Sequence, residues 1–183
     1  MLSDNYIVER LEAKFPNMTS TVKEERYGLL TFVVDKEVIF SVIQFLKEDP
    51  ELNFNFLTDL CGVHIPDQES KELGVIYHLH NLFLNKRIRI KTFFPIRNPH
   101  TPSITKLYAG ANWMERETYD FFGILFDGHP NLKRILNVDE MNYFPMRKEY
   151  PLEDGTRTDK DDRFFGREGH IGREFDKRAD RLQ

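Results

Sequence analysis

The spacing of apolar and polar positions divides the chain into helical and extended segments. Apolar residues at helical spacing predict a helix over 3–15, with Ser3 as its N-cap. A broader apolar stripe predicts a second helix that is capped by Asp35 and stopped by Asp49-Pro50. A third helix is expected from about Ser103 to Phe122, with Gly123 ending it.

Short runs rich in β-branched and aromatic residues predict strands between these helices. We expect them over 29–34, 53–61, 75–84 and 87–94, with the last two forming a hairpin around Asn85-Lys86. In the last strand Arg87, Arg89 and Lys91 share the face opposite the apolar residues. That face is either the solvated side of an edge strand or a docking surface for an acidic partner.

The periodic pattern fails after Phe126, and the composition changes again at Gly155. The sequence therefore predicts an α/β (α+β) domain over residues 1–126, with a mixed sheet and flanking helices. A long irregular arm over 127–154 and a charged tail over 155–183 are expected to follow. The tail holds many charges of both signs and few apolar residues, which suits a segment that wraps around a partner.

The densest polar stretch, ERETYDFFG, lies at the end of the third predicted helix. A helical wheel places Glu115 in the middle of the apolar stripe, and Glu117 and Asp120 near the opposite face. A buried carboxylate is costly without a partner, so we expect Glu115 to pair with Arg134 or Arg147 downstream. The motif would then pin the arm to the helix.

A catalytic use of the same carboxylates is disfavoured. An acid and base pair must face one substrate, yet Glu115 and Glu117 point apart on a helix. The sequence also contains no nucleophile elbow, no Gly-rich phosphate loop and no HExxH motif. A stand-alone hydrolase that uses the 115–129 cluster remains as the alternative from another functional class.

The composition limits which cofactors, metals and partners this chain could bind. One cysteine, Cys61, cannot hold an iron–sulfur cluster, and a net charge of −4 gives no general reason to expect nucleic acid. Cys61, His64, His78 and His80 could form a zinc site if neighbouring strands bring them together. The alternative is that His78 and His80, which share a face with Ile76, Leu82 and Leu84, are partly buried and satisfied by other partners. His129, between Gly128 and Pro130, is expected to set a rigid turn.

The run PSITKLYAGANWMERETYDFFGILFDGHPNLKRILNVDEMNYFPMRKEYPL, residues 102–152, resembles one family closely. That family is the C subunit, the 30-kDa type, of proton-translocating NADH–quinone oxidoreductase, or respiratory complex I. The upstream runs DLCGVHIP and YHLHNLFLNKRIRIKTFFP resemble its strand segments. The sequence departs from the family pattern at Lys133, where Arg is usual, at Tyr143, where Gly is usual, and at His64, where an acidic residue is usual.

The resemblance implies a non-redox structural subunit of the peripheral arm, on the cytoplasmic side of the inner membrane. FMN and iron–sulfur clusters would lie in other subunits, and the quinone-site D subunit would be a direct partner. A related membrane-bound hydrogenase or a deazaflavin-type dehydrogenase could use a similar subunit. No catalytic, cofactor or metal residue is expected in this chain. The expected structural and interface residues are Glu115, Arg116, Glu117, Asp120, Gly128, His129, Pro130, Arg134, Pro145, Arg147, Lys148 and Pro151.

Overall fold

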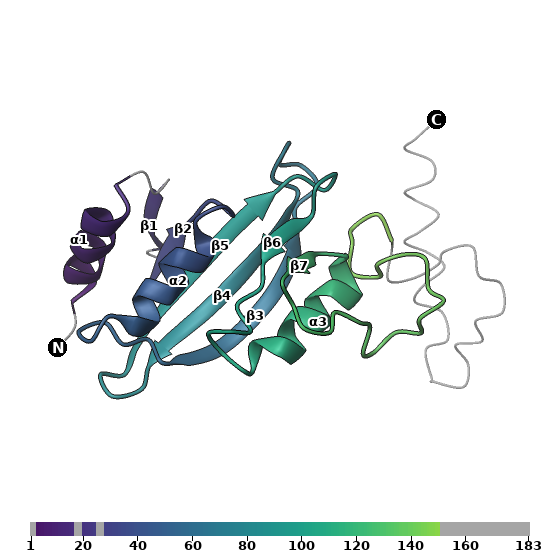
Figure 1. Cartoon of the computed structure of the whole chain (residues 1–183). Helices are drawn as coiled ribbons and strands as arrows, with labels where there is room; N and C mark the ends of the chain where they lie inside the picture. Colours follow the sequence, from purple (N-terminus) through teal and green to yellow (C-terminus); the bar gives the residue numbers. More distant parts are fainter. Residues whose placement is uncertain (1–2, 17–19, 25–27, 151–183) are drawn as a thin grey trace, which may run out of the picture. The chain divides into compact units, whose positions relative to one another are not determined.

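The computed structural model describes residues 3–16, 20–24 and 28–150 (Figure 1). The chain divides into two units, Met1–Tyr150 and Pro151–Gln183, so the described residues all belong to the first. The predicted tail and the last four residues of the predicted arm, Pro151 among them, lie outside the described residues. The elements in chain order are α1 (Asp4–Lys14), β1 (Ser20–Glu24), β2 (Leu29–Val33), α2 (Ile39–Glu48), β3 (Phe56–His64), β4 (Leu73–Asn81), β5 (Lys86–Phe94), β6 (His100–Pro102), α3 (Ala111–Phe122) and β7 (Leu125–Asp127).

Five strands form one mixed sheet in the order β1-β2-β5-β4-β3. The pairing of β2 with β5 is parallel, and the other pairings in this sheet are antiparallel. Strands β6 and β7 form a small parallel pair beside it. The predicted fold class, an α+β domain with a mixed sheet and flanking helices, is therefore confirmed.

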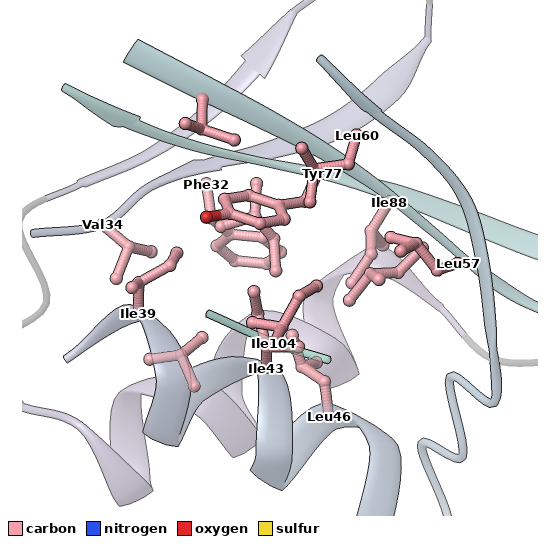
Figure 2. Packing of buried hydrophobic residues seen from close by; sticks show 14 of the residues in the cluster. Phe32, Val34, Ile39, Ile43, Leu46, Leu57, Leu60, Tyr77, Ile88 and Ile104 are labelled. Carbon is pink, nitrogen blue, oxygen red and sulfur yellow. The ribbon is translucent and has the colours of Figure 1, made fainter. Parts of the chain in front are cut away.

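The core lies between the sheet and α2 (Figure 2). Phe32, Tyr77 and Ile88 on the sheet face Ile39 and Ile43 on the helix, and all five are buried. These positions alternate along the strands and recur along the helix, so the apolar pattern alone brings the two layers together. Burying each large side chain stabilises the fold by about 1.5–3 kcal/mol before the entropy of ordering is subtracted.

Helix α3 packs on the same face of the sheet as α2, at the outer strand β3. Gly62 of β3 lies on the core face, and a Cβ there would meet the Phe122 ring at 2.5 Å and the Thr118 methyl group at 3.0 Å. The absence of a side chain at Gly62 therefore sets how closely the helix approaches the strand. This approach fixes the position of the residues on α3.

Two helix starts differ from the sequence prediction. Ser3 caps α1 as expected, and its side chain accepts a hydrogen bond from the Tyr6 amide. The second helix begins at Ile39, because residues from Asp35 to Val38 form a turn closed by the Val38 amide and the Asp35 carbonyl. The third begins at Ala111, because turns occupy the stretch before it. Its predicted end at Gly123 is confirmed, with φ at 72°.

The prediction of an edge strand at 87–94 was wrong. Strand β5 lies in the middle of the sheet, between β2 and β4, because a parallel pairing with β2 adds neighbours on its far side. Its basic residues lie on the sheet face away from α2. There the Arg89 side chain donates to Nε2 of His78 over 3.0 Å. The outermost described strand beside α3 is instead β3.

We expect Gly62→Ala to lower the free energy of unfolding by about 1–3 kcal/mol, because the methyl group would overlap the Phe122 ring. Chemical denaturation measures this change. Gly110→Ala is the matched control, since a Cβ at that exposed residue meets nothing within 4 Å. Equal effects of the two substitutions would contradict the packing described here.

Candidate functional site

The irregular arm is held to α3 by the carboxylate of Asp120, which is fully buried. Its Oδ1 accepts from Arg134 Nη1 at 2.8 Å and from the Asn137 side chain at 3.0 Å. Its Oδ2 accepts from the amides of Ile135, Leu136 and Asn137 at 2.8–3.0 Å. One carboxylate therefore fixes the backbone of three consecutive arm residues.

The charge on Asp120 is stabilised by these donors. Burial by itself would raise the pKa of this carboxyl group. Four donors outweigh that effect: the backbone amides of Asn137 and Leu136, the Asn137 side chain and the Arg134 guanidinium. Together they hold the pKa of Asp120 well below its usual range. The Asp120 carboxylate is ionised throughout the physiological pH range. In its ion pair with Arg134, both side chains are buried.

Arg134 extends the same network into the next turn of the arm. It donates to the carbonyl groups of Asp120, Met141 and Tyr143 at 2.8–3.1 Å. Its guanidinium group also lies over the Phe144 ring, 5.1 Å from the centroid. The planar fork of arginine suits this role, because it can serve several acceptors at once.

The end of the arm packs against the C-terminus of α3. Arg147 donates through Nε to the Phe122 carbonyl at 2.8 Å and also contacts Phe144, 4.7 Å from the centroid of its ring. A cation at this position satisfies a free carbonyl at the helix end and complements the helix dipole. Gly123 is required here, because a Cβ would lie 2.4 Å from Phe144 and its φ is positive.

Two histidines complete the attachment. Nδ1 of the buried His64 accepts from the Lys148 amide at 2.9 Å, which ties the arm to β3. Burial lowers the pKa of His64 and so favours the neutral ring that this bond needs. His129 accepts from the Asn131 amide through Nδ1 and donates through Nε2 to the Asn112 carbonyl. The expectation that His129 sets a turn agrees with these bonds.

The remaining expected site residues lie around this network. Arg116 donates to the carbonyls of Lys133 and Arg134 at 3.1 and 3.4 Å. Glu117 is exposed, as the helical wheel predicted, whereas Asp120 was wrongly placed on an exposed face. Gly128 and Pro130 are exposed, Pro145 is half-buried, and Gly128 has φ at 84°.

Glu115 is fully buried as predicted, but its predicted pairing with Arg134 or Arg147 was wrong. Its Oε1 accepts from the Ile104 amide at 2.7 Å, and its Oε2 has no hydrogen-bond partner within the described residues. Burial raises the pKa of Glu115 to about 7, against the smaller opposing effects of the Ser103 hydroxyl and the Ile104 amide. Glu115 therefore anchors the turn before α3, while Asp120 anchors the arm.

The structure does not bring the candidate zinc ligands together. The sheet register sets Cys61 opposite Ile76, and His78 lies near the carboxylate of Asp59 at 3.8 Å. Among the residues that the structure describes, no group of three or more Cys, His, Asp or Glu side chains could hold a metal ion. His78 bonds to the Arg89 side chain and His80 to the Asn85 side chain, as the alternative interpretation expected.

The carboxylates also do not form a common acid and base site. Glu115 bonds to the turn before the helix, Glu117 faces solvent and Asp120 is engaged by the arm. Sequence reasoning missed Asn137 and Phe144, which complete the anchor. Neither belongs to a periodic pattern, and only the loop-forming tendency of asparagine gave a weak signal.

The fold and this site define a class of protein. It is a mixed-sheet domain in which the last helix of the described residues, α3, holds an ordered arm through a buried ion pair. The family described as "Respiratory-chain NADH dehydrogenase, 30 Kd subunit" matches residues 32–156. This chain belongs to that family. The match covers both the described arm and most of the sheet.

Individual relatives agree with this assignment. The C subunit of NADH-quinone oxidoreductase from Nocardioides sp. is 46% identical over 125 residues, which cover 68% of this chain and 50% of the relative. The protein of the same description from Roseiflexus sp. is 44% identical over 151 residues, 82% of this chain and 86% of the relative. The chain thus spans about half the length of the Nocardioides protein and most of the Roseiflexus protein.

Two solved structures have folds similar to that of this chain. A trypsin-resistant fragment (1-134) of Nqo5 aligns with a TM-score of 0.60 at 30% identity, covering 70% of this chain and 98% of the fragment. A chain of the membrane-bound sulfane sulfur reductase, described as an archaeal respiratory membrane complex, aligns with a TM-score of 0.66 at 27% identity. That alignment covers 81% of this chain and 85% of the other.

We expect Asp120→Ala to lower the free energy of unfolding by about 3–5 kcal/mol, because it leaves the Arg134 guanidinium buried without its counter-charge. Urea denaturation measures this change, with Glu117→Ala on the exposed face of the same helix as the control. A loss at Asp120 no greater than that at Glu117 would refute the anchor.

We expect Glu115→Gln to flatten the pH dependence of stability. The pKa of Glu115 is about 7 in the folded protein and ordinarily 4.5. The stability that its protonation contributes is therefore fully present below about pH 4.5 and is lost as the pH rises through 7. At about 1.4 kcal/mol per pKa unit, the wild type loses at most about 3 kcal/mol that the glutamine variant keeps. Denaturation at pH 5 and pH 8 tests this, and identical pH profiles for the two proteins would contradict it.

Proposed function

We propose that this chain is a non-redox structural subunit of the peripheral arm of NADH–quinone oxidoreductase. The whole complex would pass electrons from NADH through FMN and iron–sulfur clusters to quinone and couple this to proton translocation. The observation that carries the proposal is the ordered arm on α3 within the region matched by the family. Its polar residues serve as structural anchors, which suits a subunit that positions a neighbour.

We further propose that the FMN and the clusters lie in partner subunits and that the quinone-site D subunit is a direct neighbour. The single cysteine supports this division, because clusters need several thiolate ligands. Cys61 is half-buried, and burial raises the pKa of its thiol, so it is a poor nucleophile and metal ligand.

The proposed location is the cytoplasmic face of the inner membrane, in contact with the membrane only through the complex. Within residues 3–16, 20–24 and 28–150, none of the helices is both long and apolar enough to span a bilayer. The structural relatives support a respiratory context, since one of them is described as part of a respiratory membrane complex.

The likeness to the sulfane sulfur reductase chain favours one second candidate function: the equivalent subunit of a related membrane-bound complex with another electron donor. A hydrogenase or a deazaflavin-type dehydrogenase would belong to this class. The two candidates differ in the donor that membranes containing this chain oxidise, so purified membranes supplied with NADH or with the other donors separate them.

Deleting the chain should abolish NADH–quinone activity in membranes, because the quinone site loses the subunit that positions it. NADH oxidation by a water-soluble artificial acceptor should persist in the flavin-bearing fragment. Both activities are measured in the deletion strain, with the strain complemented by the wild-type chain as the control. Normal quinone-linked activity without this chain would overturn the scaffold role.

A further inference from the structure

Helix α3 also carries a large aromatic side chain that is exposed to solvent. Trp113 is 63% exposed, although tryptophan usually buries most of its surface. Asn112, the residue before Trp113 in α3, lines an open hollow of about 360 Å³ together with Thr105, Lys106, Ala109, Gly128 and Pro130. We call this hollow, together with Trp113 and Arg116, the Trp113 surface.

The Trp113 surface is held rigid by the bonds already described. The Asn112 carbonyl in the hollow accepts from His129, which fixes the Gly128–Pro130 turn against α3. Arg116 lies over the Trp113 ring, 4.9 Å from its centroid, while its N–H groups bond to the carbonyls of Lys133 and Arg134. A large exposed side chain on such a fixed support loses little further freedom when it binds.

Three cations and two carboxylates lie around this surface. Lys106 and Lys133 are exposed, and Arg116 adds a third cation beside the ring. The carboxylate of Asp127, next to Gly128 in the chain, bonds to Nδ1 of His100 at 3.0 Å and remains a negative charge at the edge of the hollow. Glu117 lies one turn after Trp113 on α3 and is exposed, so it adds a second carboxylate at that edge. The two exposed lysines, Lys106 and Lys133, therefore complement a partner that carries carboxylates at those positions.

We propose that the Trp113 surface docks an acidic segment of a partner subunit, which places an apolar side chain in the hollow and carboxylates near Lys106 and Lys133. This inference rests on the proposed function, since it requires that the chain assembles into a complex. Trp and Arg are the residues that most often dominate binding energy, particularly beside a pocket. The cations around the ring select the acidic partner and its orientation.

Competition during assembly tests the proposal. Wild-type chain and a Trp113→Ala variant with a different tag are co-expressed, the complex is purified through another subunit, and mass spectrometry gives their ratio. We expect the variant to be under-represented about tenfold or more, as is typical for a central interface tryptophan. The matched control is Phe83→Ala, which truncates an aromatic ring that is 81% exposed on the β4–β5 turn.

Lys106→Glu should also be excluded, whereas Lys14→Glu on the exposed face of α1 should compete equally with wild type. Thermal unfolding of each isolated variant shows whether the chain still folds.

A photo-reactive residue at position 113 should cross-link to an acidic segment of another subunit. A cross-link to a second copy of this chain or to its own residues 151–183 would overturn the proposal, as would equal competition by Trp113→Ala and Phe83→Ala. If the wild-type chain itself enters no complex, the proposed function is wrong, and the docking proposal that rests on it is wrong too.

Discussion

The described structure beyond β7 depends on one buried carboxylate, that of Asp120. Residues 127–150 have few buried apolar side chains, so hydrophobic burial alone would not order them. Asp120 replaces that burial with hydrogen bonds to the Arg134 guanidinium, to the Asn137 side chain and to three consecutive amides. Burying a charge costs free energy because the charge loses its water, and the hydrogen bonds to Asp120 offset this cost. The arm is thereby attached to α3 rather than to a core of its own.

The same helix shows how environment decides the state of a carboxyl group. Glu115 receives one backbone amide and is fully buried, and burial raises its pKa to about 7. Asp120, five residues later, receives donors on both oxygens and remains ionised. Both side chains are fully buried in the described structure, so neither is exposed to a substrate. A motif that is dense in charged residues therefore fits a structural role, in agreement with the membership of the chain in the 30 Kd subunit family.

The sequence pattern predicted the fold class and most elements, because apolar periodicity reports directly on burial. It also predicted that Glu115 is buried and that Arg134 binds a carboxylate. It assigned the wrong acceptor, because a helical wheel recognises only the face covered by apolar residues. The second buried face of α3 is covered by the arm, whose polar residues give no periodic signal. The central position of β5 was missed for a similar reason, since a parallel pairing with β2 depends on long-range topology.

The central claim is that the arm is already ordered on α3 in the isolated chain, before any partner binds. Amide hydrogen exchange at Ile135, Leu136 and Asn137 tests it most directly, because these three N–H groups all donate to the Asp120 carboxylate. The account predicts slow exchange in the purified chain, comparable with the protection of amides within α3. Exchange at the rate of an unstructured peptide in the isolated chain would contradict it, since the arm would then be ordered only by its partner.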